Sequence, residues 1–187
     1  MDTIINISIF VITGLSFIAC FRKEGRWDLQ KGLKSLRFFT ILSNLFCAVS
    51  ALLLVLSSSQ WAWLLKYVGT VAVTITLLTV LFFLGPNMGY KQMLSGKDLY
   101  RHLCGPLLAI VSFCFMERWY ALSFPLSLLG ILPVIIYGFV YLFEVVILKN
   151  WEDFYGYNKD GKWILSMAAM FAGGFAVCML IRILYYI

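Results

Sequence analysis

Charged residues are scarce in this chain. Asp, Glu, Lys and Arg together make up 13% of its 187 residues, against roughly 25% in soluble domains. Proline is also rare, with four in total, and no polar tract or charged block is present, which excludes a disordered arm or an appended soluble domain. Hydrophobic residues make up 62%. This composition predicts an integral membrane protein whose function lies in the membrane bundle itself.

Candidate metal ligands are also few. The only histidine is His102, which excludes bis-histidine haem ligation. The five cysteines have no Cys-x-x-Cys spacing, and most of them lie in apolar segments, where a thiol behaves as a small hydrophobe. We therefore expect no disulfide, no metal and no cofactor.

Long apolar runs recur along the whole chain. Each is close to the roughly 20 residues that cross a bilayer as a helix. They cover residues 4–21, 38–56, 64–84, 103–120, 124–148 and 163–185. The first run has no basic segment before it, so we expect an uncleaved helix and not a signal peptide. The pattern predicts an all-α fold, a polytopic bundle of six transmembrane helices forming a single domain.

The basic residues mark one side of the predicted bundle. Twelve of the fifteen Lys and Arg residues lie in the loops after the first, third and fifth helices. The positive-inside rule places these loops in the cytoplasm and both termini outside it. Because the basic residues flank apolar runs and form no stripe on a soluble face, the net charge of +6 does not indicate a nucleic-acid partner.

Polar residues inside a membrane helix are costly unless they are paired, so they are the first candidates for function. At the head of the second helix, Thr40, Ser43, Asn44 and Cys47 share one face. One interpretation is structural: Thr40 and Ser43 bond to their own helix, and Asn44 joins two helices. The other interpretation is that this face forms part of a site.

The second candidate is His102, at the start of the fourth helix and four residues before Pro106. Pro106 has no N–H for the carbonyl of His102, so a polar pocket is plausible there. A simpler interpretation makes His102 an interfacial residue and Pro106 a first-turn proline. In the predicted topology, Thr40 and His102 lie at similar depth on the cytoplasmic side. Their side chains could therefore meet.

Together these residues suggest a nucleophile and a base. A neutral imidazole beside Thr40 would take the hydroxyl proton as the oxygen attacks an ester. Asn44, supported by Ser43, would donate to the developing oxyanion. Glu144 lies at matching depth, where it would orient His102.

An alternative role for Glu144 is an ion pair with Arg37 or Arg101, because a carboxylate near basic loops needs no further explanation. At the other end of the bundle, we expect Glu117 to pair with Arg182. We expect Gly173 and Gly174 to mark a close helix contact.

Two segments resemble a known family. Phe39-Thr40-Ile41-Leu42-Ser43-Asn44-Leu45 and His102-Leu103-Cys104-Gly105-Pro106 are similar to segments of the androgen-induced-gene-1-like membrane proteins, which include androgen-dependent tissue-factor-pathway-inhibitor regulator, and especially to their small bacterial relatives. The resemblance implies a bacterial plasma membrane protein and an intramembrane threonine hydrolase that cleaves fatty acid esters of hydroxy fatty acids. It assigns catalysis to Thr40 and His102. The chain departs from the vertebrate pattern in having a single histidine and in the Ser43-Asn44 pair.

The leading hypothesis is therefore a hydrolase whose partner is a membrane lipid or fatty acyl ester. A second hypothesis is a non-enzymatic channel or transporter, with a solute path lined by Asn44 and by threonines of the third helix: Thr70, Thr74, Thr76 and Thr79. A third is a regulatory membrane protein, which predicts that Thr40 and His102 lie far apart. The loop from Trp151 to Asn158 either anchors the chain at the membrane interface or caps the site. The oligomeric state stays open.

Overall fold

Six long helical segments make up most of the molecule. The computed structural model describes all 187 residues and is all-α, with 80% of residues in helices. As the sequence predicts, six segments are long and apolar enough to cross a membrane: Asp2–Phe21, Phe39–Leu56, Gln60–Met88, Gly96–Met116, Phe124–Ile147 and Trp163–Tyr186. The fold is consistent with an integral membrane bundle.

Several of these segments combine α-helix with other turns. The α-helices are α1 (Asp2–Ile18), α2 (Leu29–Ser35), α3 (Phe39–Leu56), α4 (Gln60–Thr79), α5 (Gly85–Met88), α6 (Tyr90–Met93), α7 (Gly96–Leu99), α8 (Gly105–Val111), α9 (Phe124–Leu128), α10 (Leu132–Tyr141) and α11 (Trp163–Tyr186). Four π-helical turns lie at Val80–Leu84, Tyr100–Cys104, Ser112–Met116 and Leu142–Ile147. Short 3₁₀ turns lie at Ala19–Phe21, Leu129–Ile131 and Lys159–Gly161.

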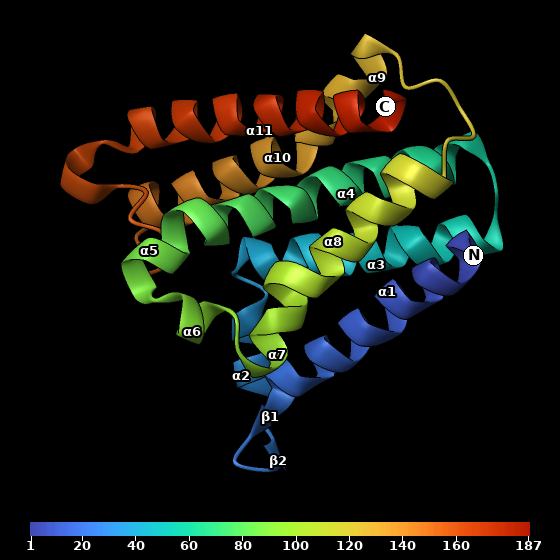
Figure 1. The fold of residues 1–187 in the computed structure, drawn as a ribbon. Helices are drawn as coiled ribbons and strands as arrows, with labels where there is room; N and C mark the ends of the chain where they lie inside the picture. The colour runs from blue at the N-terminus through green and yellow to red at the C-terminus, as the bar shows by residue number, and fades with distance from the viewer.

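The central helix of the bundle is α4 (Figure 1). It packs against α3 and α8 on one side and against α10 and α11 on the other, while α1 lies outside α3 and α8. Within its most apolar stretch, 61% of the α4 segment is buried, against 22% for α1 and for α11. The outer helices therefore leave apolar surface free for lipid.

The two ends of the bundle differ. Both termini lie at one end (Figure 1). The other end, called here the basic end, carries α2, α6, the loop 148–162 and a small hairpin of β1 (Arg22–Lys23) and β2 (Arg26–Trp27). Gly25 closes this hairpin with a φ of +79°, which a glycine adopts without strain.

The fourth segment begins and ends earlier than the hydropathy predicts. It runs from Gly96 to Met116, so His102 lies inside the helix and not at its entrance. A π-helical turn, Tyr100–Cys104, precedes the Gly105-Pro106 step, and the Gly105 N–H donates to the Tyr100 carbonyl. This wider turn accommodates the missing N–H of Pro106 and lets the helix continue.

The end of the bundle opposite the basic loops contains a buried ion pair. Lys66 of α4 and Glu117 are both fully buried, with 3.8 Å between Nζ and Oε1. Lys66 Nζ also donates to Asn6 Oδ1 (2.5 Å) and to Ser112 Oγ (3.0 Å), and the Asn6 amide donates to Glu117 Oε1 (2.7 Å). This network joins α1, α4 and the end of the α8 segment within the apolar interior.

The predicted ion pair between Glu117 and Arg182 is therefore wrong. Arg182 instead donates from Nε to the carbonyl of Leu122 (3.3 Å), and its guanidinium lies 5.6 Å from the centre of the Tyr186 ring. The carboxylate of Glu117 points into the bundle, where Lys66 supplies the opposite charge.

Candidate functional site

A polar cavity of about 500 Å³ lies at the basic end, and both Thr40 and His102 line it. The structure thus brings together two residues far apart in the chain, one from the first turn of α3 and one from the π-helical turn before α8. Charged side chains surround the same cavity: Lys31, Lys34, Lys97, Asp98 and Arg101. The hypothesis of a regulatory protein expected the first two residues to be far apart, and it gains no support here.

One hydrogen bond determines which nitrogen of His102 carries a proton. Its Nδ1 lies 2.7 Å from the carbonyl oxygen of Met93. A carbonyl only accepts hydrogen bonds, so Nδ1 must be the donor. In the neutral ring, Nε2 is then unprotonated and able to act as a base. The group that orients the imidazole is the Met93 main chain.

Thr40 lies in the first turn of α3. The N-cap residue, Phe38, makes no side-chain hydrogen bond to the helix. Instead, the Phe39 N–H donates to the phenol oxygen of Tyr155 (3.2 Å). Burial raises the pKa of Tyr155, although its hydrogen bond with the Phe39 N–H opposes this rise. Tyr155 therefore keeps its proton beside Thr40 at neutral pH.

Asn44 and Ser43 both act within the helix packing. The Asn44 amide donates to the carbonyl of Thr40 (2.7 Å) and to that of Arg101 (3.1 Å), which joins α3 to the π-helical turn of the fourth segment. Both of its N–H groups are thereby engaged, and neither residue lines the polar cavity. Ser43 Oγ lies 2.9 Å from Thr76 Oγ1. Asn44 braces the two helices that carry Thr40 and His102.

Glu144 does not contact His102 or a basic side chain. Its Oε2 accepts from the Asn150 amide (3.1 Å), and its main-chain carbonyl accepts from the Asn150 N–H (2.8 Å). Arg101 pairs instead with Asp98 (3.1 Å), and Arg37 lies over the Trp151 ring. Glu144 therefore holds the start of the loop 148–162 through its two hydrogen bonds with Asn150, and it forms no ion pair.

Arg101 anchors the histidine-bearing segment to α1. It is buried, and its Nε donates to Ser16 Oγ (2.7 Å) while a terminal nitrogen donates to the Ser16 carbonyl and to Cys20 Sγ. The lysines around the cavity, Lys31, Lys34 and Lys97, form no ion pair. The mouth of the cavity is therefore electropositive, which favours an anionic ligand.

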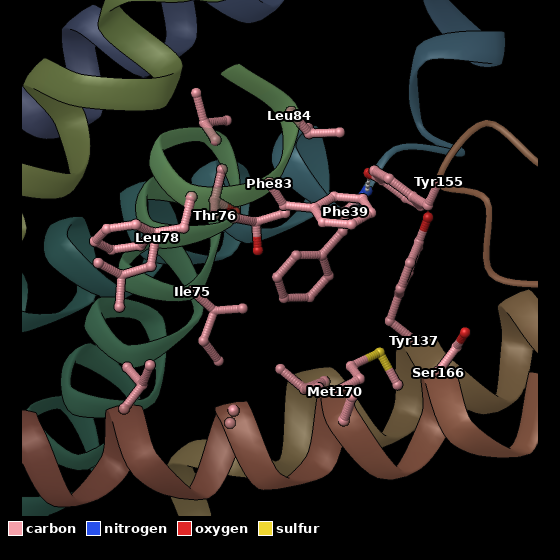
Figure 2. A pocket seen from close by; sticks show the side chains of 18 of the residues that line it. Phe39, Ile75, Thr76, Leu78, Phe83, Leu84, Tyr137, Tyr155, Ser166 and Met170 are labelled. Carbon is pink, nitrogen blue, oxygen red and sulfur yellow. Dashed lines mark hydrogen bonds between the residues drawn. The ribbon is translucent and has the colours of Figure 1, made fainter. Parts of the chain in front are cut away.

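A second, apolar cavity of about 710 Å³ lies beside the first. Figure 2 shows its walls: Ile75, Leu78 and Phe83 from the α4 segment, Met170 from α11, and Phe39 and Tyr155 at one end. The residues that line both cavities are Thr40, Leu84 and Tyr155. Thr40 thus lies at the boundary between the polar, basic cavity and the apolar cavity.

Small residues of α11 create room in this apolar cavity. Gly173 lines it, and a Cβ added there would meet nothing within 4 Å. At Gly174, a Cβ would lie 2.9 Å from Ile131 Cγ1. The expected close helix contact is therefore present at Gly174, whereas Gly173 widens the cavity. Along α11 the cavity extends from Ser166 to Leu180, which is ~21 Å at a rise of 1.5 Å per residue.

The loop after α10 folds over the site. Tyr155 and Phe154 line the polar cavity, and Tyr155, Gly156 and Tyr157 line the apolar one. This arrangement supports the capping interpretation over simple anchoring at the interface. Sequence reasoning did not single out Tyr155, and the one available signal was the density of aromatic residues in this loop.

Two of the four α4 threonines suggested for a solute path, Thr76 and Thr79, line the apolar cavity, and the other two line neither cavity. Thr70 Oγ1 donates to the Lys66 carbonyl (2.9 Å) and Thr74 Oγ1 to the Thr70 carbonyl (2.7 Å). Both are buried, and neither lines the polar or the apolar cavity. Their hydroxyl groups are satisfied within their own helix, as the structural interpretation of such residues predicts.

Comparisons with protein-family models, with curated proteins and with solved structures found no match. What bears on the function of this chain is therefore the geometry of its own residues.

Proposed function

We propose that the protein is an intramembrane lipid ester hydrolase in which Thr40 is the nucleophile and His102 the base. The observation that carries this proposal is the position of Thr40. It lines one cavity with His102 and a second cavity that is long, apolar and open to an acyl chain. An ester held with its chain in the apolar cavity would place its carbonyl at Thr40.

The proposed reaction has two stages. Thr40 Oγ attacks the acyl carbon while its proton passes to His102 Nε2, and the carbonyl electrons move to the oxygen. The oxyanion collapses, the bond to the alcohol oxygen breaks, and His102 returns the proton to that oxygen. Water then repeats both steps on the acyl-threonine. The net reaction converts ester and water into acid and alcohol.

The tautomer of His102 suits this role. The Met93 carbonyl holds Nδ1 as the donor and leaves Nε2 to accept a proton. Arg101 and Asn44 fix the helix segment that carries the imidazole against α1 and α3. Such fixed positions reduce the entropy lost on reaching the reactive geometry.

The substrate class we propose is an acyl ester that also carries an anionic group. The apolar cavity fits a single long chain, and the lysines at the polar mouth favour negative charge. Fatty acid esters of hydroxy fatty acids, suggested by the family resemblance, have both features. We place the site in the cytoplasmic leaflet, because the positive-inside rule orients the basic end that way.

Hydrolysis of long-chain acyl esters by the detergent-purified protein tests this proposal. Thr40→Ala and His102→Ala should each lower kcat by ~100-fold or more, and the double variant should be no worse than either one. Thr74→Ala is the matched control, since it removes a buried threonine hydroxyl that lines neither cavity. Full activity in His102→Ala would reject the nucleophile–base pair and would leave Thr40 and His102 with a role in helix packing only.

A further inference from the structure

Tyr155 lies at the boundary between the two cavities. With Thr40 and Leu84 it lines both of them, and it is the only one of the three with a phenol. Figure 2 shows its oxygen pointing toward the backbone at Phe39, at the head of α3. The phenol oxygen therefore lies at the boundary between the two cavities, next to the first turn of α3 that carries Thr40.

The hydrogen-bond pattern leaves the Tyr155 O–H available. Its oxygen accepts from the Phe39 N–H (3.2 Å), and a phenol can also donate one hydrogen bond. The hydroxyl groups of two neighbouring tyrosines already donate to other acceptors: Tyr137 to the Arg37 carbonyl (2.7 Å) and Tyr141 to Asp153 (3.1 Å). No carbonyl or carboxylate accepts from Tyr155.

The loop holds this phenol in place. Asp153 accepts hydrogen bonds from the main-chain N–H groups of Tyr157 and Asn158, both at 2.7 Å. The Tyr155 N–H donates to the phenol oxygen of Tyr141 (3.2 Å). Its ring packs against the rings of Tyr141 and Phe154, with centroids 5.5 Å and 4.7 Å away. A donor fixed in advance stabilises developing charge with little reorganisation.

We propose that Tyr155 donates the hydrogen bond that stabilises the oxyanion formed when Thr40 attacks an ester. This inference rests on the proposed hydrolysis, and it assigns to Tyr155 the role that the sequence suggested for Asn44. As the carbonyl electrons move to oxygen, the Tyr155 O–H donates to that oxygen and keeps its proton. The Phe39 N–H, by donating to the phenol, makes the O–H a stronger donor.

The test compares Tyr155→Phe with the wild-type protein. Because Phe keeps the ring packing and removes only the hydroxyl, kcat for acyl-ester hydrolysis should fall by ~100-fold, with KM close to wild type. The melting temperature should fall only slightly, because the Phe39 N–H loses its acceptor. The rate at which a fluorophosphonate modifies Thr40 should fall in parallel, since its tetrahedral adduct needs the same donor. Tyr185→Phe is the matched control: it removes a buried phenol bond (2.7 Å to the Tyr120 carbonyl) at the opposite end, and it should keep wild-type kcat.

The outcomes separate this inference from the proposed function. If Thr40→Ala abolishes hydrolysis while Tyr155→Phe keeps wild-type kcat and labelling rate, the oxyanion role of Tyr155 is rejected and the hydrolase stands. If Tyr155→Phe loses activity only in proportion to its folded fraction, the phenol is structural and the inference is also rejected. If the wild-type protein shows no Thr40-dependent hydrolysis, both proposals fail together.

Discussion

Replacing Lys66 with Met should strongly destabilise the protein. Lys66 and Glu117 are each fully buried, and 3.8 Å separates Nζ from Oε1. The variant leaves the Glu117 carboxylate in the apolar interior without its counter-charge and deprives Asn6 Oδ1 of its donor. Removing one partner of a buried ion pair costs about 3–5 kcal/mol. At about 2–4 °C per kcal/mol for a chain of this size, the melting temperature should fall by ~10 °C.

Thermal unfolding in detergent, followed by circular dichroism, measures this effect. Combining Lys66→Met with Glu117→Gln removes both charges, and the glutamine still accepts from the Asn6 amide, so the double variant should be more stable than Lys66→Met alone. Lys23→Met, in the exposed hairpin, is the control and should leave the melting temperature unchanged. An unchanged melting temperature in Lys66→Met, or losses that add in the double variant, would refute the role of the ion pair.

The other predictions concern topology, helix packing and the length of the acyl chain. A C-terminal alkaline phosphatase fusion should be active and a C-terminal green fluorescent protein fusion dark, as the positive-inside rule requires; the opposite pattern would invert the orientation. Gly174→Ala should lower the melting temperature, because its Cβ would lie 2.9 Å from Ile131 Cγ1, whereas Gly173→Ala should not. Because Gly173 lines the apolar cavity, Gly173→Leu should slow hydrolysis of long-chain esters more than that of short-chain esters. Asn44→Ala should cost about 1–3 kcal/mol of stability, because the buried carbonyl of Arg101 loses its side-chain donor; unchanged thermal stability would show that Asn44 does not join the two helices.

The helical segments could be predicted because hydropathy is a local property. A run of about 20 apolar residues needs no tertiary information to be recognised as a spanning helix. The boundaries of the fourth segment were harder to place, since charged residues within Gly96–Arg101 lower its hydropathy while the chain is already helical. Arg101 can be buried there because Ser16 of α1 supplies hydrogen-bond acceptors. No sequence pattern predicts that contact.

Dependence on tertiary contacts also explains why the sequence did not indicate the roles of Lys66 and Tyr155. The sequence did not indicate a buried ion pair at Lys66, because its partners Asn6 and Glu117 come from distant parts of the chain. The loop from Trp151 to Asn158 allowed both an anchoring and a capping interpretation, and the position of Tyr155 depends on the hydrogen bonds that Asp153 accepts within the folded loop. That Thr40 and His102 lie near one another could be predicted, because their depth along two helices follows from topology alone.

The central claim, that Thr40 is the nucleophile of the proposed hydrolase, is tested most directly by locating the adduct of a fluorophosphonate probe. The purified protein is treated with the probe, digested, and its peptides are analysed by mass spectrometry. The predicted result is one covalent adduct on Thr40, absent from Thr40→Ala and formed far more slowly in His102→Ala. An adduct on another residue, or an unmodified Thr40 in a preparation that the probe inactivates, would contradict the assignment.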